Sequence, residues 1–435
     1  MKLLAKALLS GVAGLFFAGN AYAQRYLSDY DSTLFMRDTL PSVIRQVKNL
    51  NFSGYIQPQW QWAQSPGAPS YTGGNFSEFS NNRFMLRRAR VKIDYRLPHK
   101  NGKKLPMAVF SYQIDATERG VVTRDMFLRV YGPGRQSTSL VVGLVARPFG
   151  FEVNLSSSVR ETPERGRMSQ ILMPTERDLG AMITYDPVLY KRKLPFKIDA
   201  GLFNGQGLVG TTDFDSYKDF ISRVTFRPQK LGGGATLSGG LSLLQGGWRQ
   251  ATRYRWAMGS KDGMKQYVVD SSMSNIGNKA PRRYYGADVQ LAFKHGWGKT
   301  ELRAEHWRGQ QPGTATTSTN PGVLPTGPTY IRNFDGSFFV LIQNIVNENN
   351  ELLVKYDWYD PNRDASGGEV GKGGTNFTPA DVRFNTLGIG YNYYFTKDFR
   401  VMFYYDIVRN ERTGLDGYTS DLKDNIFTCR FHFLF

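Results

Sequence analysis

The C-terminal residues of the chain alternate between apolar and polar side chains. The apolar set is Phe427, Cys429, Phe431, Phe433 and Phe435, and the polar set is Thr428, Arg430 and His432. Successive side chains of a β-strand point to opposite faces, so this segment predicts a strand with one apolar and one polar wall. Such a terminal strand is typical of an outer-membrane β-barrel with its apolar wall against lipid. Taken alone, it is also compatible with the edge strand of a soluble sandwich.

The same alternation recurs from Asn51 onward and predicts about sixteen strands. The expected spans are 51–63, 82–97, 105–116, 123–131, 138–147, 178–186, 195–204, 217–228, 235–247, 281–294, 297–308, 336–346, 349–359, 382–396, 398–409 and 424–435. Connections after even-numbered strands are mostly short, and those after odd-numbered strands are mostly long. This asymmetry characterises outer-membrane barrels, and a soluble sandwich has no reason to show it. We therefore predict an all-β fold at 51–435, a transmembrane antiparallel β-barrel with short periplasmic turns and long extracellular loops.

Residues 1–23 have the layout of a cleavable secretory signal. Two lysines precede an apolar run, and small residues predict cleavage near Ala23. The run is too short for a membrane helix, so the mature chain is either soluble or crosses a membrane as a closed barrel. Together with the strand pattern, this predicts the outer membrane of a Gram-negative bacterium. Residues 24–50 are expected to form a short periplasmic segment with a helix at 38–48.

The cations of the predicted strands lie on the polar face. The chain carries 55 Lys and Arg against 37 Asp and Glu, a formal charge of +18. A cation at the bilayer midplane costs about 2–4 kcal/mol, so the charged face is expected to line the lumen. The expected lumen cations are Arg88, Arg90, Lys92, Arg96, Arg129, Arg223, Arg227, Lys355 and Arg430, and the acids are Asp94, Asp115, Asp125, Glu301, Glu305 and Asp357. These cations are either solvated and paired, or they attract anions, since rings of Arg or Lys select for anions.

The loop at 148–177 is the expected constriction. It contains the apolar run Ile171-Leu172-Met173, which an external solvated loop does not need. An inward fold would pack this run on the wall and present arginines to the pore, whereas the alternative is a loop folded over the outside of the mouth. The arginines expected to bind anions at the constriction are Arg147, Arg160, Arg165, Arg167 and Arg177.

Three stretches of the chain resemble the phosphate-selective porin O and P family. They are Arg83-Phe-Met-Leu-Arg-Arg-Ala-Arg90, the pair formed by 142–152 and Arg177-Asp-Leu-Gly180, and the terminal 424–435. The likeness spans most of the chain from about residue 51. It implies a sixteen-stranded homotrimer with an inward third loop, in which an arginine ladder and a central basic site pass phosphate or other anions. The family's individual phosphate-binding residues are not carried over to positions of this chain.

The predicted function is passive diffusion of small anions, such as phosphate or polyphosphate, through the outer membrane. A general or sugar-preferring porin is the alternative, for which inward-facing Phe127 and Tyr404 are the aromatic candidates. The cation-rich loop at 248–280 is expected to contact lipopolysaccharide phosphates, to funnel anions or to bind another partner. Secretion argues against nucleic acid as the anionic partner of this basic chain.

No catalytic, cofactor or metal site is predicted. Enzymatic hydrolysis needs a nucleophile and a base within hydrogen-bond reach, and only His306, on the expected lipid face, is a candidate base. A histidine at that position is more often a member of the aromatic belt. The single cysteine, Cys429, excludes an internal disulfide, and no metal-ligand spacing occurs.

Overall fold

The computed structural model describes residues 48–99, 105–132, 137–187, 194–210, 212–261 and 263–435. The chain divides into two units, 1–51 and 52–435, and the second holds nearly all of the described structure. The predicted signal segment at 1–23 and almost all of the predicted periplasmic segment at 24–50 lie outside the described residues. No helix in the described part of the chain is long and apolar enough to cross a membrane.

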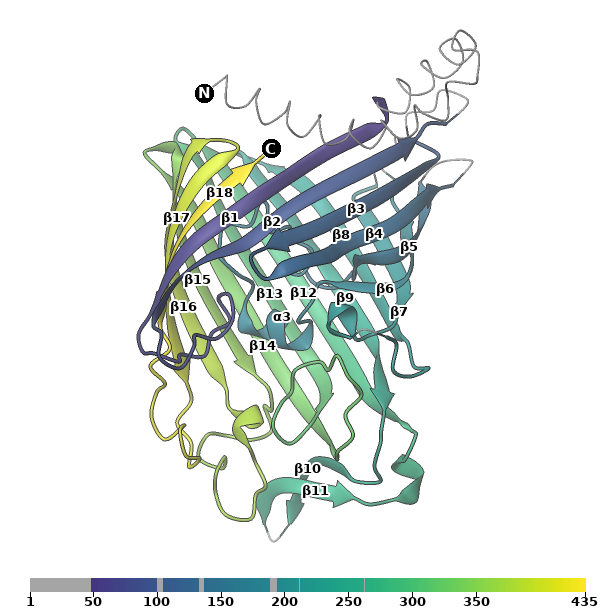
Figure 1. Ribbon diagram of the computed structural model, residues 1–435, viewed down its shortest axis with the longest axis vertical. Coiled ribbons are helices and arrows are strands. Elements are labelled where there is room, and N and C mark those ends of the chain that lie inside the picture. The colour runs from purple at the N-terminus through teal and green to yellow at the C-terminus, as the bar shows by residue number, and fades with distance from the viewer. Residues whose placement is uncertain (1–47, 100–104, 133–136, 188–193, 211, 262) are drawn as a thin grey trace, which may run out of the picture. The chain divides into compact units, whose positions relative to one another are not determined.

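Sixteen strands pair in one closed antiparallel barrel (Figure 1). They are β1 (Leu50–Ala63), β2 (Asn82–Leu97), β3 (Ala108–Thr117), β4 (Gly120–Tyr131), β5 (Thr138–Ala146), β6 (Arg177–Tyr185), β7 (Phe196–Phe203), β8 (Asp219–Gly232), β9 (Ala235–Arg249), β12 (Lys279–His295), β13 (Gly298–Gly313), β14 (Thr329–Ile345), β15 (Asn347–Asp360), β16 (Phe384–Thr396), β17 (Phe399–Asn410) and β18 (Ile426–Leu434). Each strand pairs with the next, and β1 pairs with both β2 and β18. The prediction of a barrel of about sixteen strands is confirmed.

The connections alternate between short turns and long loops, as the sequence predicts. Short turns join β12 to β13, β14 to β15 and β16 to β17 at one rim, and the long loops extend from the other rim (Figure 1). The longest loops carry extra elements: the hairpin of β10 (Arg255–Lys261) and β11 (Met264–Asp270), and the 3-10 turns η3 (Gly207–Val209), η4 (Met273–Asn275) and η5 (Pro379–Asp381). The hairpin adds a short parallel pairing between β10 and β14.

Each strand separates an apolar outer face from a more polar inner face. On β15, Leu352, Val354 and Tyr356 are 39–42% exposed on the outside, whereas Lys355 between them is 3% exposed. Because the side chains of a strand alternate, one residue type can face lipid while its neighbour faces the lumen. The outer face supplies the apolar band that a bilayer requires.

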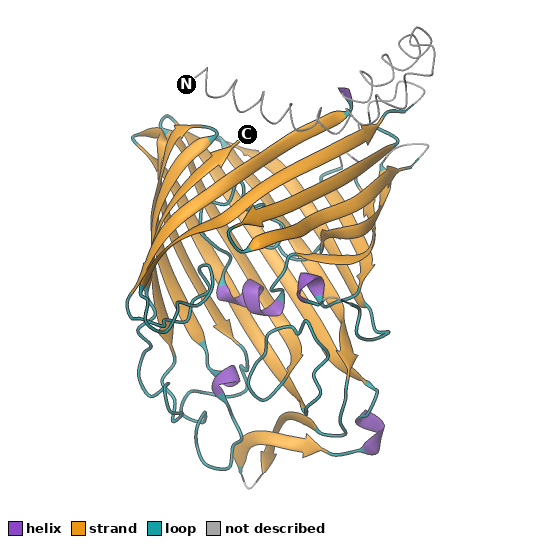
Figure 2. Cartoon of the chain, in the orientation of Figure 1, coloured by secondary structure: helices purple, strands orange, loops and turns teal. Residues whose placement is uncertain are grey.

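The connection between β5 and β6, here called the inward loop (147–176), packs against inward-facing side chains of the strands. It carries the short helix α3 (Arg167–Leu172), which is visible inside the ring of strands (Figure 2). The ring of Phe149 lies 4.7 Å from that of Trp307 on β13. Ile171 and Leu172 are buried in the same apolar cluster. The apolar side chains of the loop are therefore covered by the barrel wall.

Gly150 allows this close packing. Its φ of +67° lies in the left-handed region, and a Cβ there would stand 2.3 Å from the Glu305 carboxylate and 2.6 Å from the Trp307 ring. Glycine adopts this conformation without steric cost and leaves room for both neighbours. The Arg147-Pro-Phe-Gly150 stretch thus turns the chain from the end of β5 into the lumen.

Candidate functional site

One carboxylate holds the inward loop to β2 and β18. Glu164 lies 2.6 Å from Arg88, 2.8 Å from Arg87 and 3.0 Å from Arg430. The side chains of Glu164, Arg88 and Arg430 are each less than one tenth exposed. Charge-assisted hydrogen bonds are roughly twice as strong as neutral ones, so this contact is a strong anchor for the loop.

The loop is also bound to the strands on its other side. Glu161 pairs with Arg303 of β13 at 2.7 Å, and Glu152 pairs with Lys355 of β15 at 2.5 Å. The buried Glu305 accepts a hydrogen bond from the Phe151 backbone N–H at 2.8 Å. Because the bonds reach strands from β2 to β15, the loop is tethered to both walls and narrows the lumen.

Most of the predicted lumen cations are paired with acids. Arg88 and Arg430 contact Glu164, Arg90 contacts Asp115, Lys92 contacts Asp94, Arg223 contacts Asp288, Arg227 contacts Asp186 and Lys355 contacts Glu152. Arg129 donates to the Ser139 hydroxyl at 3.0 Å, and Arg96 is exposed near the end of β2. The cations therefore occupy the inner face as expected, but few of them are left without a neutralising partner.

Three of the five arginines expected at the constriction stabilise the loop itself. Their partners are the Thr175 carbonyl for Arg147, the Met173 carbonyl and Glu176 for Arg165, and Asp125 and Glu176 for Arg177. Arg147 and Arg165 are at most 7% exposed. A guanidinium that already donates to protein oxygens has fewer N–H groups for a passing solute.

Arg160 and Arg167 differ from Arg165 and Arg177, because neither pairs with a carboxylate among the described residues. Arg160 donates to the Leu155 carbonyl at 3.1 Å, and its Nε and Nη1 have no hydrogen-bond partner in the described part of the chain. Burial lowers the pKa of Arg160 to about 10, so the side chain remains charged at neutral pH. The guanidinium of Arg167 lies 3.6 Å from the ring centre of Phe384 and 4.5 Å from that of Tyr71.

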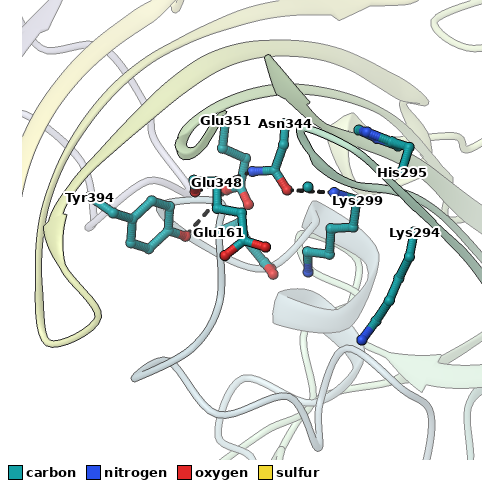
Figure 3. A pocket seen from close by; sticks show the side chains of 9 residues that line it. Glu161, Lys294, His295, Lys299, Asn344, Glu348, Glu351 and Tyr394 are labelled. Carbon is teal, nitrogen blue, oxygen red and sulfur yellow. Dashed lines mark hydrogen bonds between the residues drawn. The ribbon is translucent and has the colours of Figure 1, made fainter. Parts of the chain in front are cut away.

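Two chambers flank the inward loop. The turn-side chamber, of about 450 Å³, has Glu161, Glu348 and Glu351 on one side and Lys294 and Lys299 on the other (Figure 3). The loop-side chamber, of about 410 Å³, is lined by Tyr71, Arg167, Thr316, Tyr359, Phe384 and Tyr418, among others. A cavity of about 40 Å³ shares Arg167 with the loop-side chamber, and one of about 20 Å³ shares Glu161 with the turn-side chamber. Both of these small cavities are lined in part by residues of the inward loop.

The aromatic lining of the loop-side chamber was not predicted. Sequence reasoning proposed only Phe127 and Tyr404 as inward aromatics, and Tyr404 is indeed buried against Phe338 and Met402. The inward direction of Tyr359 could have been predicted, because side chains two residues apart on a strand face the same way and Lys355 and Asp357 of β15 face inward. Tyr71 and Tyr418 lie in long loops, where no periodicity indicates which way a side chain points.

The closed sixteen-strand barrel with a loop packed inside it has the fold of the outer-membrane porins. The similar solved structures include OprB of Pseudomonas putida, which is 10% identical, with a TM-score of 0.57 over 92% of this chain and 97% of that chain. They also include the outer membrane channel DcaP of Acinetobacter baumannii, which is 12% identical, with a TM-score of 0.51 over 89% of this chain and 97% of that chain.

Salmonella typhi OmpF, solved in a complex with daunomycin, is 11% identical, with a TM-score of 0.50 over 89% of this chain and 97% of that chain. No family model matches the sequence, and no curated protein matches it. At these identities the likeness establishes the fold. The resemblance to the phosphate-selective porin O and P family stays a prediction.

Proposed function

We propose that this protein is an outer-membrane channel for passive diffusion of small solutes, with a preference for anions. The supporting observation is the charge of the small cavity of about 20 Å³ beside the inward loop. Its lining includes the cations Arg160, Arg303 and Lys355 and the acids Glu152 and Glu161. Charged rings at a constriction set ion selectivity, so one uncompensated cation at this position favours anions.

The selectivity is tested by recording single channels of the purified protein in a salt gradient. We expect a reversal potential of the sign that chloride preference produces, and a low conductance because the loop is bound to both walls. A current carried mainly by potassium would contradict the proposed preference. Absence of any channel activity in the folded protein would contradict the diffusion function itself.

Transport of phosphate or polyphosphate is the finer proposal. Arg can bind phosphate through two parallel hydrogen bonds, but a guanidinium already paired with an acid must exchange that partner first. Arg160 and Arg167 need no such exchange, because neither has a carboxylate partner among the described residues. If phosphate is the preferred anion, adding it to a chloride solution should block the chloride current. An equal block by sulfate would indicate a general anion site instead.

A general or sugar-preferring porin is the second candidate. The observation that favours it is the aromatic and hydroxyl-rich lining of the loop-side chamber, together with the pairing of most lumen cations. Sugars are recognised by aromatic rings and hydrogen-bonding groups rather than by charge. Liposome swelling with neutral sugars of increasing size distinguishes the two candidates, since an anion channel should discriminate by charge at equal size.

We also propose that the chain forms a homotrimer, and that β13 and β14 contribute to the contact between copies. His306 lies on the same outer face of β13 as the exposed Leu302, and Ser337 lies on the same outer face of β14 as the exposed Phe339. His306 Nδ1 lies 2.7 Å from the Ser337 hydroxyl. Ser337 is 3% exposed, whereas His306 is partly exposed on this wall. Polar groups facing lipid are costly, so cover of His306 by a second copy would be stabilising. Native mass spectrometry from detergent tests the assembly, and a uniform monomer would exclude it.

The loop at 248–280, which carries the hairpin of β10 and β11, remains a proposed contact for lipopolysaccharide. Arg255 pairs with Asp270 at 2.9 Å, and the Lys265 ammonium reaches the Asp364 carbonyl at 3.2 Å. Both side chains keep part of their donors free for lipid phosphates. Loss of lipopolysaccharide binding in a Lys261→Gln, Lys265→Gln double variant would support this role, and unchanged binding would exclude it.

A further inference from the structure

The loop-side chamber combines a cation, aromatic rings and hydroxyl groups. Its volume of about 410 Å³ lies within the range of about 300–1,000 Å³ that small-molecule sites occupy. Its lining comes from six separate parts of the chain, which include Tyr71 in the first long loop, Arg167 on α3, the stretch 316–319 and Phe384 on β16. The rest of the lumen that we have described is lined mainly by paired charges, so this chamber is chemically different.

Arg167 is the cation of the chamber, and its guanidinium donates no hydrogen bond to any of the described residues. It is held by the rings of Phe384 and Tyr71, at 3.6 and 4.5 Å from their centres, and its buried Nε has no partner. A guanidinium stacked on aromatic faces keeps the N–H groups at its edge free for a carboxylate or phosphate. Arg165, two residues earlier, has no such freedom because it donates to the Met173 carbonyl.

Acids behind Arg167 limit the charge of an acceptable anion. Arg167 also lines the adjoining small cavity, together with Arg165 and the three acids Asp357, Asp406 and Asp424. Neither carboxylate oxygen of Asp424 has a hydrogen-bond partner among the described residues. These acids repel a polyanion more strongly than a monoanion. The surroundings of Arg167 therefore favour a monoanion.

The remaining lining suits the body of a sugar. Thr316, Thr317, Ser318 and Thr319 place four hydroxyl side chains at the chamber, and Tyr359 and Tyr418 add aromatic rings. Hydroxyl groups both donate and accept, so they can match the hydroxyls of a sugar in several orientations. The apolar C–H face of a sugar ring can pack against an aromatic ring, as apolar groups do in ligand sites generally.

We propose that the loop-side chamber is a binding subsite for a sugar that carries a single carboxylate, such as a hexuronate. The carboxylate is bound by the guanidinium edge of Arg167, the sugar ring packs against the aromatic rings, and its hydroxyls contact the threonines. This inference rests on the proposed diffusion function and specifies a solute class for it.

The test uses glucuronate, glucose and acetate as probes of the full-length protein in detergent and in planar bilayers. Calorimetric titration in detergent measures binding without requiring a current. Glucuronate should bind about tenfold or more tightly than glucose or acetate, because it alone engages both the cation and the sugar-binding groups. Equal affinity for acetate would reduce the site to a simple anion site, and equal affinity for glucose would exclude a role for Arg167; either result overturns the proposal.

Variants locate the site. Arg167→Gln should weaken glucuronate binding about tenfold or more and leave glucose binding unaffected. Phe384→Leu should also weaken glucuronate binding, because the guanidinium of Arg167 is then less well oriented toward the carboxylate. Lys372→Gln, in an exposed loop, is the matched control for loss of one cation. Unchanged glucuronate binding in both Arg167→Gln and Phe384→Leu would overturn the proposal. Binding without any current would instead refute only the diffusion function, so the two failures are distinguishable.

Discussion

Replacing Glu164 by glutamine should release the inward loop from one wall. Glu164 is the shared partner of Arg87, Arg88 and Arg430. The side chains of Glu164, Arg88 and Arg430 are almost fully buried. Removing one partner of a buried ion pair costs about 3–5 kcal/mol, since the remaining charge stays desolvated. Glutamine keeps the shape and can still accept a hydrogen bond, so we expect about 3 kcal/mol for release of the loop.

A change of that size multiplies the population of the released loop by roughly 150-fold. Hydrogen exchange of the backbone N–H groups at 160–173 should therefore become faster, while exchange in the strands stays unchanged. Single-channel records should show more frequent open-state fluctuations. The reversal potential should also move toward stronger anion preference, because one negative charge has been removed from the lumen.

Glu118→Gln is the matched control. This glutamate lies in the short turn between β3 and β4, its side chain is 47% exposed, and it pairs with Arg119 at 3.6 Å. An exposed pair contributes about 0–1 kcal/mol, so loop exchange and conductance should not change. If Glu164→Gln showed the same loop protection and the same current noise as Glu118→Gln, the proposed anchoring of the loop would be wrong.

Three further predictions concern the lumen. Burial raises the pKa of Asp424, in the last long loop, to about 6; its carboxylate is therefore mostly charged at pH 7 and mostly neutral at pH 5, and anion preference should rise as pH falls, by a smaller amount in Asp424→Asn than in the unchanged protein. Gly150→Ala should destabilise the loop by about 1–3 kcal/mol, because its φ of +67° disfavours a side chain and the Cβ would contact Glu305, and thermal unfolding should report the loss. Arg160→Gln should lower the anion-to-cation permeability ratio in a salt gradient more than Lys261→Gln does, and equal effects would place the selectivity outside the constriction.

The alternation of side chains predicted the barrel well. Each of the sixteen expected spans corresponds to a strand, and the largest differences are at the loop-side ends, where β13 and β14 extend further than expected. Hydrophobic periodicity ends where a strand leaves the bilayer, so hydrogen-bonded strand beyond the membrane has no signal in the sequence. The hairpin of β10 and β11 was assigned to a loop for the same reason.

The candidate site was predicted only in outline. The sequence indicated which cations face inward, as the contacts of Arg223 and Lys355 show. It did not indicate that nearly every such cation meets an acid. Glu164 is more than 260 residues from Arg430 in the chain, and no local pattern pairs them.

The strand period and the cost of burying charge in lipid are local properties, and they were enough to determine from the sequence alone the barrel, its apolar outer wall and its charged inner wall. The tertiary structure decided which of those charges remain unpaired and where aromatic rings gather. Arg165 and Arg167 are two residues apart, yet one is bound by carbonyls of its own loop and the other is stacked between Tyr71 and Phe384. The difference depends on which distant side chains the closed barrel brings beside each guanidinium, because electrostatic and packing interactions act through space and not along the chain.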